Sequence, residues 1–169
     1  MPMLPEEVIK SIEEGQRLRG WIANGYSQVE YLLGDIVTQA FLLESYADIA
    51  ERLPHKVEKR INLVRSILEI DGPFSEFMDD IEAVIVAFEI HHDLRNLLAH
   101  GFCSAYHTPV GDFGLEFRKW HRVNQEDKQL IKTFRLVDLE YHRAQLADVS
   151  QRMLELSFRI HDKLGLLGP

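Results

Sequence analysis

The sequence has a single cysteine, Cys103, among its 169 residues. One thiol cannot close an intramolecular disulfide, and it cannot supply the thiolate cluster of a structural zinc site. The longest apolar run, residues 83–88, is far shorter than the roughly 20 residues that cross a bilayer. The chain does not open on a basic segment followed by an apolar one. We therefore expect no signal peptide, no membrane partner and a cytoplasmic location.

The chain also lacks an excess of positive charge. It has 19 Lys or Arg residues against 27 Asp or Glu, which gives a net charge of −8. Proteins that coat long nucleic acids by counterion release are usually basic, so an acidic chain binds RNA only through a local positive cleft. Hydrophobic residues make up 46% and charged residues 27%, a balance typical of globular proteins. At this length we expect one domain, residues 1–169.

Four helical patterns follow from apolar residues that recur three and four positions apart. They cover residues 22–43, 55–68, 73–99 and 138–164. Pro54 suits the start of the second pattern, Gly101 stops the third, and Asp138 is the candidate N-cap of the fourth. A shorter amphipathic segment, residues 5–20, precedes the first pattern, and Gly20 and Gly25 lie where the two would join.

The stretch before the last helical pattern is different. Residues 102–107 and 115–122 are rich in aromatic residues, and glycines lie between them, which is typical of a β-hairpin. Residues 133–137 could form a third short strand. The predicted fold is therefore mainly α. It is a four-helix up-and-down bundle with a core of residues 21–164 and a small β-hairpin or three-strand insertion at about 102–137, before the last helix.

The third helical pattern is apolar on two sides. With about 100° per residue, five apolar residues lie within about 60° of Ile81, and this face continues through His92 to Ala99. A second apolar group lies on the opposite side: Ala83, Val86, Ile90, Leu94 and Leu97. Such a helix is either buried centrally or shared with a second molecule, so we expect a homodimer. The alternative, that the strand insertion or the N-terminal segment covers the second face, stays open.

An Arg-Asn-x-x-Ala-His segment, residues 95–100, ends this third pattern. RNA carries its own nucleophile, the 2′-hydroxyl, so cleavage needs a proton-transferring group and a cation for the phosphorane. Histidine titrates near neutrality and arginine stays charged, so His100 and Arg95 suit these roles, while Asn96 can position a phosphate. No metal or other cofactor is required. Arg95 and His100 lie about 140° apart on a helix, so they converge if the helix frays at Gly101 or if two copies meet.

The segment resembles the Arg-x-x-x-x-His motif of HEPN domains, including the polar residue after the Arg, and the helical pattern of residues 20–164 fits that family. The resemblance implies a homodimer with facing motifs and a metal-independent endoribonuclease, often a toxin or defence effector with a cognate antitoxin protein. It implies that Arg95 and His100 are catalytic and that Asn96 supports them. Some HEPN toxins are silenced by adenylylation of a Tyr two residues after the His. Phe102 stands there in this chain, which argues against that control.

Three neighbouring features have alternative interpretations. His91 and His92 either line the same cleft or are partly buried polar residues. Glu89 and His92 have the spacing of half a di-iron site, but the chain has no second Glu-x-x-His, so we expect no metal. Cys103 has the position of a thiol nucleophile, although a small buried apolar role is the more common one for such a residue.

A basic and aromatic cluster lies on the predicted hairpin: Arg118, Lys119, Trp120, His121 and Arg122. This mixture suits RNA phosphates and bases, and it equally suits the solvated face of an amphipathic strand. Two functions compete with ribonuclease activity. One is a non-catalytic interaction module, since some HEPN members have lost catalysis. The other is nucleotide binding that uses the same Arg and His as phosphate anchors.

Overall fold

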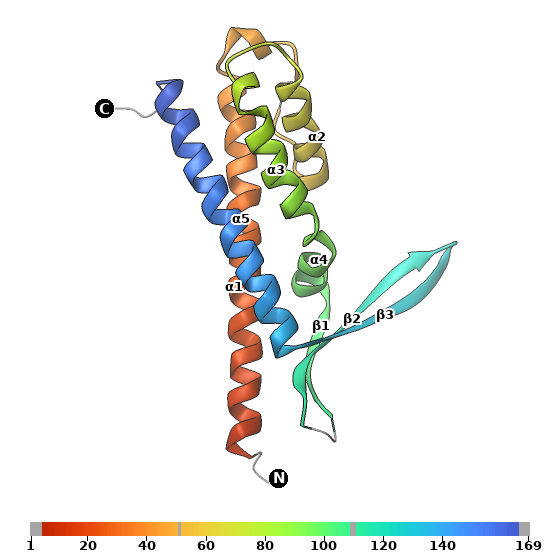
Figure 1. Ribbon diagram of the computed structural model, residues 1–169. Coiled ribbons are helices and arrows are strands. Elements are labelled where there is room, and N and C mark those ends of the chain that lie inside the picture. Colours follow the sequence, from red (N-terminus) through yellow and green to blue (C-terminus); the bar gives the residue numbers. More distant parts are fainter. Residues whose placement is uncertain (1–4, 51, 109–110, 166–169) are drawn as a thin grey trace. The chain divides into compact units, whose positions relative to one another are not determined.

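The computed structural model describes residues 5–50, 52–108 and 111–165 (Figure 1). Within this range the chain is mainly helical, with five α-helices and a three-stranded antiparallel sheet just before the last helix. The helices are α1 (Glu6–Ala40), α2 (Val57–Leu68), α3 (Met78–Glu89), α4 (His92–His100) and α5 (Leu136–Lys163). The strands are β1 (Phe102–His107), β2 (Phe113–Val123) and β3 (Glu126–Arg135). Among these helices none is both long and apolar enough to span a bilayer.

The chain divides into two compact units. The first unit contains residues up to 25 together with residues 91–147, and the second contains residues 26–90 together with those from 148 onward. Helices α1 and α5 each contribute one part to each unit. The sheet and α4 therefore belong to the first unit, and α2 and α3 belong to the second.

Helix α1 is one continuous element, although the sequence predicts a separate segment at residues 5–20. The two glycines in its middle do not interrupt it. Gly25 lies beside α5, where an added Cβ atom would stand 3.4 Å from the Cβ of Leu146. A small residue at this position allows the two helices to approach closely, so the glycine serves packing and does not end the helix.

The third predicted helix is divided in two, because α3 ends at Glu89 and α4 begins at His92. No glycine or proline occurs between residues 78 and 100, so the sequence contains no local signal for this break. The break separates the two halves of the second apolar face. Val86 in α3 is 53% exposed and Ile90, directly after α3, is 72% exposed, whereas Leu94 and Leu97 in α4 are buried. The predicted continuation of the first face to the end of the helix is also wrong, since Ala99 is exposed.

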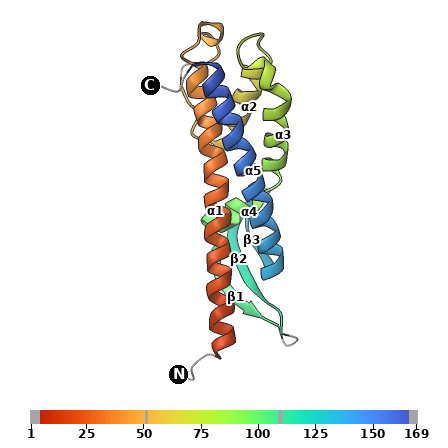
Figure 2. The ribbon, with the colours of Figure 1, turned by 60° about the vertical axis from the view of Figure 1, so that its left-hand side comes forward.

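Four helical segments pack together in the second unit: the end of α1, α2, α3 and the end of α5. Within the second unit the ends of α1 and α5 run in the same direction, as Figure 2 shows. Ser150 donates to Gln28, and further along both helices His161 bonds Asp35. A strict up-and-down order would make the first and last helices antiparallel. The long connection of residues 41–56 between α1 and α2 does not enforce the alternation that a short loop would.

The core of the second unit is apolar. The rings of Tyr26 and Phe88 lie in contact, with centroids 4.2 Å apart, and both side chains are fully buried. Buried aliphatic and aromatic residues from all four segments surround them, among them Val29, Leu33, Ile36, Val64, Ile67, Ile81, Ile85, Val149, Met153 and Ile160. Burying a side chain of this size contributes about 1.5–3 kcal/mol, so this core is the main source of the unit's stability.

The sheet of the first unit is an antiparallel meander in the order β1-β2-β3. Its second hairpin turns at Asn124 and Gln125, which both have positive φ angles, 52° and 68°, as a two-residue turn requires. The third strand is much longer than the predicted residues 133–137. Asp138 lies inside the first turn of α5, where its carboxylate accepts the backbone N–H of Arg135 at 3.0 Å. The predicted N-cap therefore caps the helix from its third position.

Candidate functional site

Helix α4 is held against β2 by its buried leucines: Leu94, Leu97 and Leu98. The helix ends at a tight junction. The Gly101 backbone is extended, and its N–H donates to the Leu97 carbonyl at 2.8 Å. A Cβ atom at Gly101 would lie 2.6 Å from that carbonyl oxygen, so only glycine fits without displacement. The chain thus passes directly from the end of α4 into β1, and His100 is fixed at the junction.

Arg19 on α1 fastens the last turn of α4. Its Nε and Nη2 atoms donate to the Leu98 carbonyl at 3.2 and 2.7 Å, and its guanidinium carbon lies 5.9 Å from the centre of the Phe117 ring. The last carbonyls of a helix have no partner within the helix, so these bonds satisfy one of them. Sequence reasoning missed this residue. Arg19 is 79 positions away from Leu98 in the sequence. The local pattern shows only that Arg19 follows the apolar Leu18, which is buried.

The solvent-facing side of α4 carries a hydrogen-bonded row. Arg95 Nη1 donates to Asn96 Oδ1 at 3.3 Å, which fixes the orientation of the amide group. The amide nitrogen of Asn96 lies 2.9 Å from Nε2 of His92 and must donate to it. In this contact Nε2 of His92 is the acceptor. One contiguous array thus links a cation, an amide and an imidazole.

His100 continues this surface. His92, Asn96 and His100 follow each other at four-residue steps, and Arg95 and Ala99 form the neighbouring row. Arg95, Asn96, Ala99 and His100 are called the α4 outer face below. Ala99 is small and exposed, so it leaves open surface between the guanidinium and the His100 ring. In the described part of the chain no hydrogen bond or ion pair engages the His100 ring.

The distance between the two predicted catalytic residues follows from the regular helix. Helix α4 stays α-helical through His100, so it does not fray to bring His100 round to Arg95. The two residues are separated by about 140° and about 7.5 Å along the axis. A ligand over Ala99 would lie between them, and a second copy of the segment is the other way to bring a guanidinium and an imidazole to one atom.

His91 has a different environment from the other predicted site residues. It is buried, and its Nδ1 lies 3.2 Å from Nδ1 of His142, with the two rings edge to face. Burial, together with the neighbouring His142, lowers the pKa of His91 to about 4. Burial also lowers the pKa of His142, against the opposing charge of Asp138. His142 had a visible signal, since it occupies a position in the apolar stripe of α5.

The other candidates have structural partners. The Glu89 carboxylate accepts two hydrogen bonds from Arg65, at 3.2 and 2.9 Å. Burial raises the pKa of the Cys103 thiol, and the charge of Arg19 offsets this only in part, so the thiolate is disfavoured. Across the described residues, no three His, Cys, Asp or Glu side chains are grouped as metal ligands would be.

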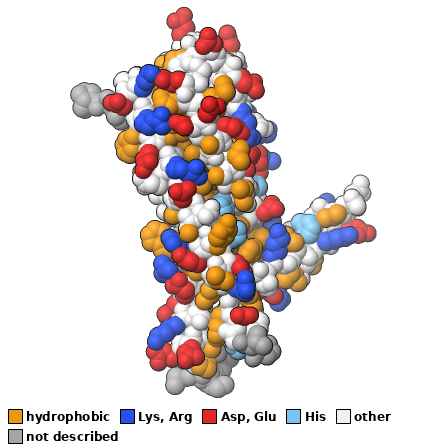
Figure 3. All heavy atoms as spheres, in the orientation of Figure 1, with side chains coloured by type: hydrophobic (Ala, Val, Ile, Leu, Met, Phe, Trp, Pro, Cys, Tyr) orange, Lys and Arg blue, Asp and Glu red, His pale blue; other side chains and the backbone are white. Residues whose placement is uncertain are grey.

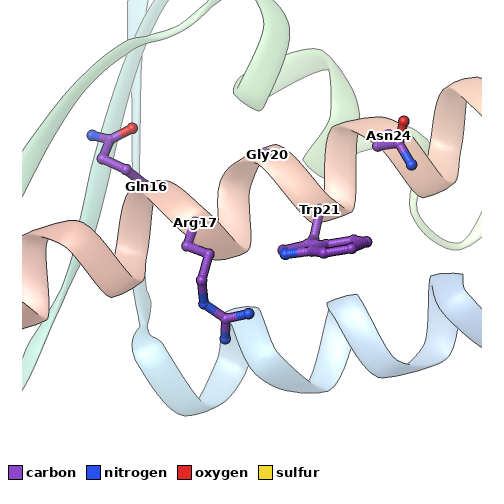
Figure 4. Close-up of a pocket in the computed structure, with 5 residues that line it drawn as sticks. All are labelled: Gln16, Arg17, Gly20, Trp21 and Asn24. Carbon is purple, nitrogen blue, oxygen red and sulfur yellow. The ribbon is translucent and has the colours of Figure 1, made fainter.

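A hollow of about 430 Å³ lies on α1, lined by Gln16, Arg17, Gly20, Trp21 and Asn24. Figure 4 shows the Trp21 ring and the Arg17 side chain on one side of the helix, with Gln16 pointing the other way. Gly20 has no atom within 4 Å of an added Cβ, so the surface beside the indole is open. None of the residues predicted for the site lines this hollow.

Four of the five predicted site residues thus lie together on the exposed side of α4, and His91 lies inside the unit. A guanidinium, an amide and two imidazoles on one short helix can bind a phosphate and transfer protons. These groups need no thiolate or carboxylate to do so. In comparisons with protein-family models, curated proteins and solved structures, nothing matches this chain.

Proposed function

We propose that this chain is a metal-independent endoribonuclease of the HEPN type, which works as a homodimer with its site between two α4 segments. The observation that carries the proposal is the α4 outer face. It carries the exposed His100 and the half-buried Arg95 and Asn96 around the small, exposed Ala99, with His92 bonded to Asn96. A surface helix that has only a structural role does not need this combination of a cation and accessible imidazoles.

The chemistry uses groups that the chain and its substrate contain. A His100 imidazole removes the proton from the 2′-hydroxyl, and the oxygen attacks the adjacent phosphorus. Arg95 stabilises the negative charge that builds on the phosphorane oxygens. The P–O5′ bond breaks, and a protonated imidazole donates its proton to the leaving oxygen. The products are a 2′,3′-cyclic phosphate and a free 5′-hydroxyl.

A second copy supplies what one copy lacks. One His100 can act as the base and the partner's His100 as the acid, so both roles are filled at the same time. The proposed fold is a four-helix bundle of the HEPN type. The four helical segments that pack together in the second unit support it. In this proposal the protein is a toxin or a phage-defence or stress effector, its substrate is RNA, and a cognate antitoxin protein restrains it.

The first experiment measures cleavage of a single-stranded RNA by the purified protein in excess chelator. We expect cutting with cyclic-phosphate ends, and we expect a 2′-deoxy substitution at the cut position to prevent it. His100→Ala should lower the rate by about 10²–10⁴. His55→Ala is the matched control, because His55 is an exposed imidazole in the second unit. Equal cutting by the His100→Ala variant contradicts the proposal.

The composite site has its own test. An equal mixture of wild type and His100→Ala tests it, because a mixed dimer contains one His100 and only a wild-type pair has both the base and the acid. Random pairing should therefore leave roughly a quarter of the wild-type rate. If each copy contained a complete site, roughly half of the rate would remain. Expression of the wild type should also slow the growth of host cells, and Arg95→Ala should relieve this effect.

The second candidate function is a non-catalytic interaction module, which the exposure of Val86 in α3 and of Ile90 at its C-terminal end favours. Apolar side chains of this size, one helical turn apart, suit a protein contact. Substitution of both residues by serine would then abolish binding of a partner protein, and the α4 variants would not affect it. Nucleotide binding without cleavage is the third outcome, which calorimetry with nucleotides would show.

A further inference from the structure

One face of the sheet in the first unit carries large apolar side chains that are open to solvent. Phe102, Arg118 and Ile131 occupy directly opposite positions on β1, β2 and β3, so they form one row across the sheet. Trp120 follows on the same face of β2, two residues after Arg118. Phe102 and Trp120 are each 68% exposed, and Ile131 is 50% exposed. These four residues are called the sheet platform.

The opposite face of the sheet accounts for the folding of the unit. Leu115 and Phe117 are buried there, and Leu115 contacts α1 at Gly15. The platform residues therefore contribute little to the core. A sheet in water normally shows polar residues on its solvated side, so two aromatic rings and an isoleucine together on that side indicate a ligand surface.

The charge around the platform is opposite to that of the whole chain. Residues 113–135 contain six Lys or Arg against three Asp or Glu, whereas the chain has a net charge of −8. The acidic residues are paired locally: Glu116 with Arg118, Asp127 with Arg122 and Glu126 with Lys128. Lys119 and Lys132, on the other face of the same hairpin, have no ion pair within the described residues. Figure 3 shows basic and histidine side chains gathered over this hairpin.

We propose that the sheet platform binds the unpaired bases of single-stranded RNA and guides the strand to His100. Aromatic rings stack on bases whatever their sequence, and Arg118 can add a guanidinium plane or a phosphate contact. Only Gly101 separates His100 from Phe102, so the platform begins where the α4 outer face ends, and β1 follows directly from α4 in Figure 1. The guiding role rests on the proposed ribonuclease function, whereas base binding by the platform does not.

Charge and ring chemistry favour RNA over a protein as the occupant. A local positive segment on an acidic chain attracts phosphates, whereas in a symmetric pairing of two platforms it would face the same positive segment of the second copy. The platform also combines exposed rings with arginine, the pair of residue types that binds nucleotides by stacking and ion pairing. The commitment to single strands follows from the flat exposed rings, because a duplex buries the faces of its bases.

The experiment uses the intrinsic fluorescence of the protein. The chain has two tryptophans, so Trp21→Phe leaves Trp120 as the only reporter. In a Trp21→Phe, His100→Ala background, a short oligouridylate should quench this fluorescence and the matching RNA duplex should not. Trp120→Ala, measured with labelled oligouridylate, should raise the dissociation constant about fivefold to hundredfold. Tyr31→Ala, which removes an equally exposed ring in the second unit, should leave it unchanged.

The outcomes separate the two proposals. Binding to Trp120 by a protein that cuts no RNA overturns the ribonuclease function and leaves the platform in place. Cutting that Phe102→Ala and Trp120→Ala leave unchanged overturns the guiding role and leaves the ribonuclease, and an unchanged dissociation constant for Trp120→Ala overturns base binding by the platform. Concentration-dependent self-association that Trp120→Ala abolishes, with no quenching by RNA, assigns the surface to a second copy. Each variant alters an exposed side chain, and a thermal melt equal to that of the parent confirms its folding.

Discussion

The two units of this chain contrast in the size of their apolar cores. In the second unit, apolar side chains from four helical segments fill the interior, and ion pairs such as those of Arg65 with Glu82 and Glu89 lie at its surface. The first unit buries fewer side chains, and it places the buried His91 at the start of α4 and the half-buried Arg19 against its last turn. Stability is therefore concentrated in one unit and candidate chemistry in the other.

The largest expected effect tests whether the second unit supplies the stability. Phe88→Ala removes a fully buried ring that contacts Tyr26, so it should lower the free energy of unfolding by about 3–5 kcal/mol. Urea denaturation followed by far-ultraviolet circular dichroism measures this loss. Phe158→Ala is the matched control, because Phe158 is exposed in the same unit, and it should change stability by less than about 0.5 kcal/mol. Similar losses for both variants would contradict the contrast.

The helical part of this architecture could be predicted because it depends on spacing. Apolar residues three and four positions apart marked α1, α2 and α5, and the aromatic stretches marked β1 and β2. The break between α3 and α4 had no local signal, since it follows from how Leu94 and His91 are buried and not from a glycine or proline. The length of β3 was missed because its residues are polar and mostly exposed, and because the Asn124–Gln125 turn lacks glycine.

The candidate site was predictable in composition but not in arrangement. The sequence named Arg95, Asn96 and His100, and the structure brings them to one side of α4. It left open whether His91 lines the cleft or is partly buried, because that placement depends on contact with His142, 51 residues away. Arg19 was missed for the same reason. Contacts of this range are set by tertiary packing, on which the local pattern carries no information.

The second expected effect concerns the buried imidazole pair of the first unit. The pKa of His91 is lowered from 6.5 to about 4, so the unfolded chain binds more protons than the folded one between these values. The contribution to stability is fully present above about pH 6.5 and is lost as the pH falls toward 4. Wild type should lose roughly 2–3 kcal/mol more than His91→Asn over this window, measured by urea denaturation at each pH. An identical pH dependence of the two proteins would show that His91 is neither buried nor paired in solution.

A smaller effect is expected where α1 holds α4 in the first unit. Arg19→Met keeps the aliphatic stem but leaves the Leu98 carbonyl without its two donors, so it should cost about 1–2 kcal/mol. Hydrogen exchange should accelerate in the last turn of α4 and at the start of β1, and RNA cleavage should fall because His100 stands at that junction. Arg17→Met is the control on the same helix, since Arg17 is exposed and its ion pair with Glu14 lies within α1. Unchanged exchange in α4 would show that Arg19 does not fasten it.

The smallest expected effect on stability comes from a comparison of one arginine in each unit, Arg65 and Arg19. Arg65 in the second unit bonds Glu82 and Glu89 at the surface, where solvent screens the charges, so Arg65→Met should cost less than about 1 kcal/mol. Added salt should reduce even this difference, whereas the effect of Arg19→Met should persist because its acceptor is a neutral carbonyl in a half-buried position. Denaturation of both variants at low and high salt makes the comparison. If Arg65→Met proved the more damaging at both salt concentrations, the surface ion pairs of Arg65 would contribute more to stability than the hydrogen bonds of Arg19, and this ranking of the two arginines would be wrong.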